Sequence, residues 1–146
     1  MKVLIDTNVF LSYMLAPEGP NTVTAVVTAC LSLDEIDLLA PPEQIAEFRG
    51  KAPTKRTFRS RIPHKAIDEF VAHLRVLGEL QPPQEESVAY SRDSKDDSLV
   101  AYAVINEADF LVTGDQDLLV LSQVGPLQIT TPAQFLKTLQ SQNLLQ

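Results

Sequence analysis

Two acidic residues directly follow apolar runs that have the length of buried strands. Asp6 comes after residues 3–5, and Asp115 ends the run over residues 110–114. In an open parallel sheet, loops and ligands collect at the carboxyl ends of the strands, so we expect the two carboxylates to meet at that edge. Such an acid must be hydrogen-bonded, paired or metal-bound, because burying an unpaired charge is costly.

Further acids can reach the same edge from the starts of helices. Glu47 is one candidate, with Glu43 one turn earlier on the same helix face, and Asp96 and Asp97 are the others. Carboxylates about 4 Å apart repel one another by roughly 1 to 4 kcal/mol unless positive charge lies between them. A hard divalent cation is the simplest resolution, and carboxylates without thiols or imidazoles favour Mg²⁺ or Mn²⁺ over zinc.

The acids in helices also have a purely structural interpretation. Asp96 and Asp97 fall in a first helical turn, where negative charge favours the helix dipole by about 0.3 to 1 kcal/mol. Glu43 and Glu47 can be solvated helix residues, and Asp117 can cap the turn in which it lies. The two acids at the strand ends are harder to explain in this way.

The sequence lacks the motifs of enzymes that use a serine or cysteine nucleophile or a nucleotide-binding loop. His64 and His73 are nine positions apart on a predicted helix, so they share no face, and we expect both at the surface. The sequence has no Gly-x-Ser-x-Gly elbow, and its five glycines form no phosphate-binding loop. Neither a serine or cysteine nucleophile nor a nucleotide-binding loop is therefore predicted.

The acids need a scaffold in which strands alternate with helices. Continuous apolar runs predict buried strands at residues 2–6, 37–40, 110–113 and 127–130. Caps and apolar periodicity predict helices over 22–33, from 42, over 63–77, over 94–107 and from 131, with a turn or short helix at 115–121. This alternation implies an α/β fold, a three-layer α/β/α sandwich with a central parallel sheet.

The length and composition fit one domain over residues 1–146, since 45% of 146 residues are apolar and 21% are charged. Pro53 and the basic residues around it are expected to interrupt the helix that begins at residue 42. Residues 78–94 are predicted as a loop with a short strand near 87–90. The glutamine-rich tail over residues 140–146 is expected to fray.

Compartment signals favour the cytoplasm. The N-terminus lacks the long apolar region of a signal peptide, and no stretch approaches the roughly 18 apolar residues of a membrane span. The lone Cys30 allows no intrachain disulfide and is expected to be a small core residue. We therefore expect a cytoplasmic protein with no membrane partner.

The net charge of −7 is unevenly distributed. Residues 49–65 carry seven basic side chains and no acid, which leaves −14 on the rest of the chain. A basic rim beside an acidic centre is typical of phosphate-backbone binding, and the alternatives are a solvated helix with its loop or a docking patch for an acidic protein. The basic residues are Arg49, Lys51, Lys55, Arg56, Arg59, Arg61 and Lys65.

Four segments together resemble the PIN-domain family in order and spacing, over nearly the whole chain. They are residues 6–12 (Asp-Thr-Asn-Val-Phe-Leu-Ser), the helix with Glu47, residues 92–97 (Arg-Asp-Ser-Lys-Asp-Asp) and residues 113–119 (Thr-Gly-Asp-Gln-Asp-Leu-Leu). The branch that looks most similar contains VapC-like toxins of bacterial and archaeal toxin-antitoxin pairs. Ser94 departs from that branch, which often has proline there, and this departure concerns the loop more than catalysis.

The resemblance implies a set of catalytic, metal-binding acids, which are Asp6, Glu47, Asp96 and Asp115. Asp117 would be an additional or supporting acid, and Asp96 is preferred to Asp97 because it matches the family acid. Asn8 would orient Asp6 or contact substrate, and Thr113 would support the site through its hydroxyl.

The function implied is that of an endoribonuclease that cleaves single-stranded RNA to 5′-phosphate and 3′-hydroxyl ends, as the toxin of a type II toxin-antitoxin pair. Mg²⁺ or Mn²⁺ would activate a water for in-line attack on the phosphodiester. The basic side chains expected to position the RNA backbone are Arg49, Lys51, Lys55, Arg56 and Arg59. An antitoxin would be a separate chain, and the helix over 22–33 offers an apolar face either to a homodimer or to the core.

Two rival hypotheses differ in chemistry. A non-catalytic PIN-fold module would bind RNA or protein and would hold metal without turnover. A phosphatase would use Asp6 as its nucleophile, but that class resembles Asp-x-Asp and this chain has Asn8 at the second position. Formation of a phosphoenzyme would distinguish the phosphatase.

Overall fold

The computed structural model describes residues 1–15, 17, 19–51, 64–78 and 94–145. Within them, five strands form one sheet in the order β2-β1-β3-β5-β4. The parallel strands are β1 (Lys2–Ile5), β2 (Asp37–Leu39), β3 (Phe110–Val112) and β5 (Leu127–Thr130). A two-residue strand, β4 (Gln123–Val124), pairs antiparallel with β5 at one edge. The predicted parallel sheet is therefore confirmed, with one antiparallel strand added.

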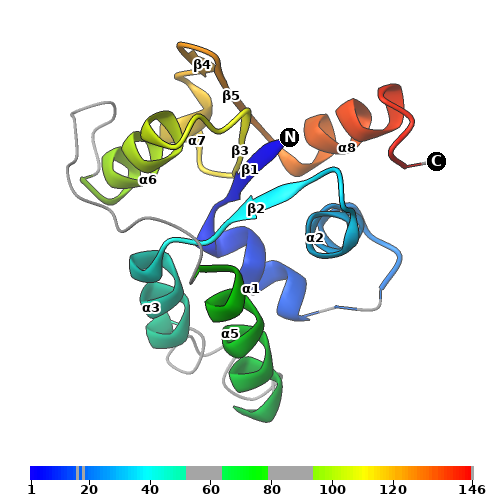
Figure 1. The fold of residues 1–146 in the computed structure, drawn as a ribbon, viewed down its shortest axis with the longest axis vertical. Coiled ribbons are helices and arrows are strands. Elements are labelled where there is room, and N and C mark those ends of the chain that lie inside the picture. The colour runs from blue at the N-terminus through cyan, green and yellow to red at the C-terminus, as the bar shows by residue number, and fades with distance from the viewer. Residues whose placement is uncertain (16, 18, 52–63, 79–93, 146) are drawn as a thin grey trace.

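Helices cover both faces of the sheet (Figure 1). They are α1 (Thr7–Leu15), α2 (Thr22–Ser32), α3 (Pro42–Lys51), α5 (His64–Gly78), α6 (Ser94–Ile105), α7 (Gln116–Leu119) and α8 (Pro132–Ser141). Because neighbouring residues of a strand point to opposite faces, Val3 and Ile5 pack with α1, α2, α3, α5 and α8, whereas Leu4 packs with α6 and α7. This arrangement confirms the three-layer α/β/α sandwich.

Capping side chains fix where several helices begin. The Asn21 side chain accepts a hydrogen bond from the Thr24 N–H at 2.8 Å and starts α2. Thr131 and Gln134 form a reciprocal capping box at α8. At α7 the cap is Asp115, whose side chain accepts from the Asp117 N–H. The prediction that Asp117 caps this turn is wrong, because it lies inside the first turn and not before it.

Three features differ from the sequence prediction. Helix α1 was not expected, because most of residues 7–15 are apolar and their polar face is limited to Asn8 and Ser12. Strand β4 is only two residues long and carries no pattern of its own. The tail does not fray through residue 145: Asn143 adopts a left-handed φ of 60°, and Leu144 and Leu145 fold back against the core.

Several predicted features lie outside the described residues. They are the interruption at Pro53 and residues 79–93 of the loop that was predicted over residues 78–94, with its short strand near 87–90. Cys30 is buried as expected, and burial raises the pKa of its thiol to about 12. None of the helices in the described part of the chain combines the length and hydropathy that a membrane span requires.

Candidate active site

Asp6 is the first residue after β1, and neighbouring groups fix its side chain where the strand ends. It is 9% exposed. Its Oδ2 accepts a hydrogen bond from the Thr113 hydroxyl at 2.7 Å, and its Oδ1 accepts one from the Asn8 backbone N–H at 3.2 Å. The Asp6 N–H donates to the Val112 carbonyl at 2.9 Å, so the β1–β3 ladder extends to this residue. Asn8 therefore contacts Asp6 through its backbone.

Asp115 reaches the same edge of the sheet from β3, which is the neighbour of β1. Its backbone N–H donates to the Thr113 hydroxyl at 3.0 Å. Thr113 is fully buried, and its single hydroxyl thus connects two acids that are far apart in the sequence. The Asp115 Oδ1 accepts from the Asp117 N–H at 2.9 Å, which fixes the carboxylate at the start of α7.

Helix α3 brings a third carboxylate to the site. Glu47 is half-buried, and its Oε2 lies 3.5 Å from the Thr7 hydroxyl, which donates to it. Glu43 is exposed one turn earlier, and it faces a different group: burial of Tyr102, together with the Glu43 charge, raises the pKa of the Tyr102 phenol. The structure therefore places Glu47, and not Glu43, beside Asp6.

Sequence reasoning missed two buried polar residues that tie these elements together. Thr7 is 3% exposed and Gln44 is 5% exposed. The Gln44 side-chain amide donates to the Ile5 carbonyl, which joins α3 to the last residue of β1. Within the described residues, the Gln44 Oε1 is buried without a hydrogen-bond partner. No local pattern distinguishes a buried glutamine from a solvated one on a polar helix such as α3, whereas Thr7 could have been noted beside Asp6.

The electrostatics of Asp6 reflect this crowding. Burial raises the pKa of its carboxyl, the Thr113 and Asn8 hydrogen bonds oppose that rise, and the charges of Asp115 and Glu47 raise it further. Among the described residues, four of the five buried polar side chains lie here: Asp6, Thr7, Gln44 and Thr113. Polar burial and like charge thus concentrate at one edge of the sheet.

The structure describes the side chains of only some of the remaining predicted site residues. Asp96 and Asp97 lie in the first turn of α6, but their side chains are outside the described set, as is that of Lys51 in α3. Asp117 is half-buried in the first turn of α7. Arg49 is exposed, and its guanidinium lies 3.8 Å from the Asp68 carboxylate of α5. Lys55, Arg56 and Arg59 are outside the described residues.

The oxygen atoms at this site are of the kind that bind a divalent cation. The side chains offer carboxylate oxygens and a hydroxyl, the ligands that Mg²⁺ and Mn²⁺ prefer, and the pKa of Asp6 is raised mainly by burial and further by the charges of Asp115 and Glu47. No group of three acidic, histidine or cysteine side chains among the described residues is already arranged to hold an ion. The donor chemistry fits, and Asp96 is the predicted fourth ligand.

The Thr113→Val variant should destabilise the protein by about 1 to 3 kcal/mol at pH 8, because it leaves the buried Asp6 carboxylate without its nearest donor. Losing that hydrogen bond raises the Asp6 pKa further above its unfolded value. The penalty should therefore be largest above the folded pKa and shrink toward pH 4, where the carboxyl is protonated. Urea unfolding across this pH range measures it, and Thr113→Ser, which keeps the hydroxyl, is the control. An equal loss at both pH values would contradict this role.

The sequence was compared with known families and proteins. The family model of the PIN domain matches residues 2–117. The chain belongs to the PIN domain family. The match spans β1 through the first turn of α7 and so includes the strand ends that carry Asp6 and Asp115. Comparison with curated proteins finds no similar sequence. PIN domains are generally nucleases, and PIN nucleases typically use divalent metals, which agrees with the acidic character of this edge.

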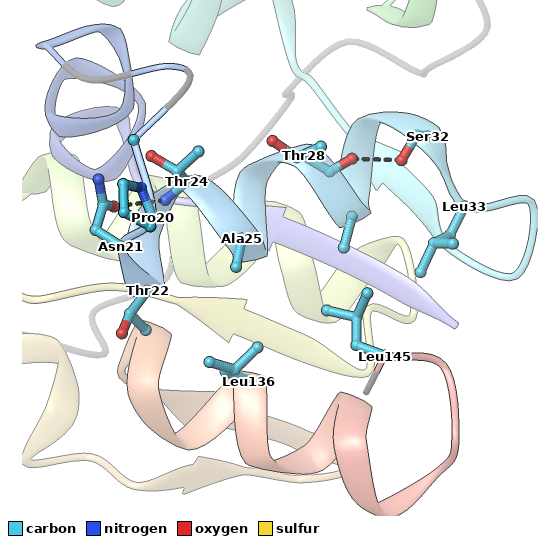
Figure 2. A pocket seen from close by; sticks show the side chains of 12 residues that line it. Pro20, Asn21, Thr22, Thr24, Ala25, Thr28, Ser32, Leu33, Leu136 and Leu145 are labelled. Atoms are coloured by element: carbon cyan, nitrogen blue, oxygen red, sulfur yellow. Dashed lines mark hydrogen bonds between the residues drawn. The ribbon is translucent and has the colours of Figure 1, made fainter.

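A cavity of about 590 Å³ lies between α2 and α8 of this PIN domain (Figure 2). Figure 2 shows Leu136 and Leu145 pointing toward α2, whose threonines and serine supply hydroxyl groups. Its described lining contains no titratable side chain, and none of the site acids contributes to it. This cavity therefore offers no acid or base chemistry.

Proposed function

We propose that this PIN domain is a metal-dependent endoribonuclease of single-stranded RNA and the toxin of a type II toxin-antitoxin pair. The observation that carries the nuclease proposal is the convergence of Asp6, Asp115 and Glu47 at one sheet edge, where the pKa of the buried Asp6 is raised by burial and by the other two charges. Nuclease chemistry gives a reason to maintain such repulsion, because a cation can occupy the space between the acids.

The chain's own residues hold the acids in fixed positions. Thr113 orients Asp6 and receives the Asp115 N–H, and the Asn8 N–H fixes the second oxygen of Asp6. Asp6, Glu47, Asp96 and Asp115 would hold Mg²⁺ or Mn²⁺, which when bound supplies a Lewis acid for the phosphodiester and lowers the pKa of water. Groups whose rotamers are fixed need little reorganisation during reaction, which is a large part of electrostatic catalysis.

The basic side chains would hold the RNA backbone. Arg49 is exposed and pairs with Asp68 across only a surface contact of 3.8 Å, which contributes little to stability. A phosphate can therefore displace Asp68 at small cost and accept two hydrogen bonds from the guanidinium. Lys51, Lys55, Arg56 and Arg59 extend the same segment in sequence, and contacts of this kind add affinity more than base specificity.

The direct test is cleavage of end-labelled single-stranded RNA with Mg²⁺, Mn²⁺ or chelator. Wild type should cut in either metal and leave 5′-phosphate and 3′-hydroxyl ends, while Asp6→Asn should lose at least about 100-fold in rate. Asp34→Asn is the matched control, because Asp34 is exposed between α2 and β2 at the opposite end of the sheet. Cleavage by Asp6→Asn at the wild-type rate would reject the site.

A growth assay tests the toxin assignment, and a cleavage assay distinguishes the nuclease from a module that only binds. Expression of wild type, but not of Asp6→Asn, should stop growth, and a neighbouring reading frame that encodes an antitoxin should relieve the arrest. A binding module is the second candidate, in which the same acids would hold the ion without turnover. Folded protein that binds Mn²⁺ and RNA without cutting would support that alternative.

A further inference from the structure

A cavity of about 340 Å³ opens directly beside the acids and is separate from the one between α2 and α8. Asp115 and the preceding Gly114 form the wall on the side of β3. The other walls come from α1, from the start of α2 and from the first residue of α8. Whatever occupies this cavity therefore touches the Asp115 side of the acid cluster.

The walls combine apolar surfaces with two polar groups. Val9, Val23 and Pro132 supply the apolar surfaces, and Val9 is only 5% exposed. Asn8 and Ser12 are exposed and four residues apart in α1, so their side chains lie on one face of that helix. Because the Asn8 backbone, and not its side chain, contacts Asp6, the amide group is available to a ligand without disturbing that acid.

The size and charge of the cavity restrict its occupant. About 340 Å³ is near the lower end of the range of roughly 300 to 1,000 Å³ for small-molecule sites. An anionic group is disfavoured because the Asp115 carboxylate lines the wall. Apart from Gly114 itself and its two chain neighbours, no described residue has an atom within 4 Å of the position that a Cβ on Gly114 would occupy, so this side of the cavity is open. A flat, neutral, partly polar group of nucleobase size satisfies these restrictions.

We propose that this cavity, which we call the nucleoside pocket, binds the nucleoside next to the scissile phosphate of a single-stranded RNA. The base packs between Val9, Val23 and Pro132, and Asn8 and Ser12 hydrogen-bond to its edge or to the ribose 2′-hydroxyl. The phosphate stays outside, at the metal-binding acids. Base-paired RNA cannot enter, because its bases are stacked and their edges are occupied. This inference rests on the proposed nuclease function and extends it to substrate selection.

The first test measures binding without catalysis. Adenosine, cytidine, guanosine and uridine are titrated into metal-free protein while backbone amide resonances are recorded, with inorganic phosphate as a separate probe. At least one nucleoside should shift the Val9, Ser12 and Gly114 signals, and Ser12→Trp and Val23→Trp should weaken that binding at least about 10-fold by filling the pocket. Thr28→Trp is the matched control, because Thr28 is an exposed α2 residue that lines the other cavity.

The second test uses cleavage and separates the two proposals. In an RNA with one defined cut, removing the base beside the scissile phosphate should lower kcat/KM about 10-fold for wild type and Thr28→Trp, but less than twofold for Ser12→Trp. If no metal-dependent cutting is seen, the proposed nuclease function is rejected. The nucleoside titration then still tests whether the pocket binds a nucleoside. The pocket proposal is overturned if no nucleoside shifts those signals, if phosphate shifts them equally, or if the tryptophan variants bind as wild type does.

Discussion

In chelator at pH 8, the Asp6→Asn variant is expected to unfold at a higher temperature than the wild type, although it loses the proposed activity. Burial, followed by the charges of Asp115 and Glu47, disfavours the ionised carboxylate of Asp6, and an amide carries no charge. A carboxyl whose folded pKa is raised contributes stability that is complete below its unfolded pKa and is lost as the pH rises through the folded value. The advantage of Asp6→Asn should therefore grow from pH 4 to pH 8.

Metal should reverse this order. At 100 times its dissociation constant, Mn²⁺ bound to the folded wild type stabilises it by about 2.7 kcal/mol, or roughly 5 to 11 °C for a chain of this length. Asp6→Asn should show less than about a fifth of that shift, whereas Asp34→Asn should show all of it. Thermal unfolding followed by circular dichroism measures both effects. A variant that is less stable than wild type at pH 8, or that keeps the full Mn²⁺ shift, would contradict this account of Asp6.

The second large effect concerns the aromatic side chains that join α1, α3 and α5. The ring centroids of Phe10 and Phe48 lie 5.4 Å and 5.3 Å from that of Phe70, and Phe10 and Phe48 are fully buried. Phe48→Ala should lower the free energy of unfolding by about 3 to 5 kcal/mol, because it removes these contacts and leaves a cavity. Urea unfolding at pH 7 measures this loss.

The milder Phe48→Leu variant tests whether the aromatic cluster also positions Glu47, in addition to stabilising the fold. Phe48 directly follows Glu47 and Phe10 lies in α1 with Thr7, so the aromatic cluster fixes the helices that bring Glu47 to the site. Phe48→Leu should lower RNA cleavage about 10- to 100-fold at a temperature at which the protein stays folded. Phe135→Leu is the matched control: Phe135 is fully buried against Phe110 at the start of β3, the end of the strand away from the acids. Equal activity losses in both variants would show that only stability is involved.

The parts of the fold that follow from local pattern were predictable. The strands ending before Asp6 and near Thr113 are short apolar runs, and helices α2 and α8 begin at Asn21 and Thr131, whose side chains satisfy exposed N–H groups. Since parallel strands align their carboxyl ends, two acids at strand ends sufficed to predict one acidic edge. The sequence did not state which strands are neighbours, and the structure shows that β1 and β3 lie side by side, which brings Asp6 and Asp115 together.

Other parts depend on contacts that no local pattern carries. The helix over Thr7–Leu15 packs between neighbours, and its exposed polar face consists of only Asn8 and Ser12, too short a stripe to show the helical period in the sequence. Gln44 lies one position after the exposed Glu43, and only the fold shows that it is buried against Ile5. Glu47 and Glu43 are alike in the sequence, and only the fold places one beside Thr7 and Asp6 and the other beside Tyr102. Leu144 and Leu145 pack because Asn143 reverses the chain, an outcome that the glutamine-rich composition concealed.

The hydroxyl link between Thr113 and Asp6 spans 107 positions of sequence, which has a consequence during synthesis. At about 5 to 20 residues per second, a ribosome makes Asp6 roughly 5 to 20 seconds before the strand that completes its surroundings. Until then Asp6 has neither the Thr113 hydroxyl as a donor nor Asp115 beside it. A chain interrupted before β3 therefore cannot assemble the acidic edge, so an unfinished copy of this protein lacks part of the proposed set of catalytic acids.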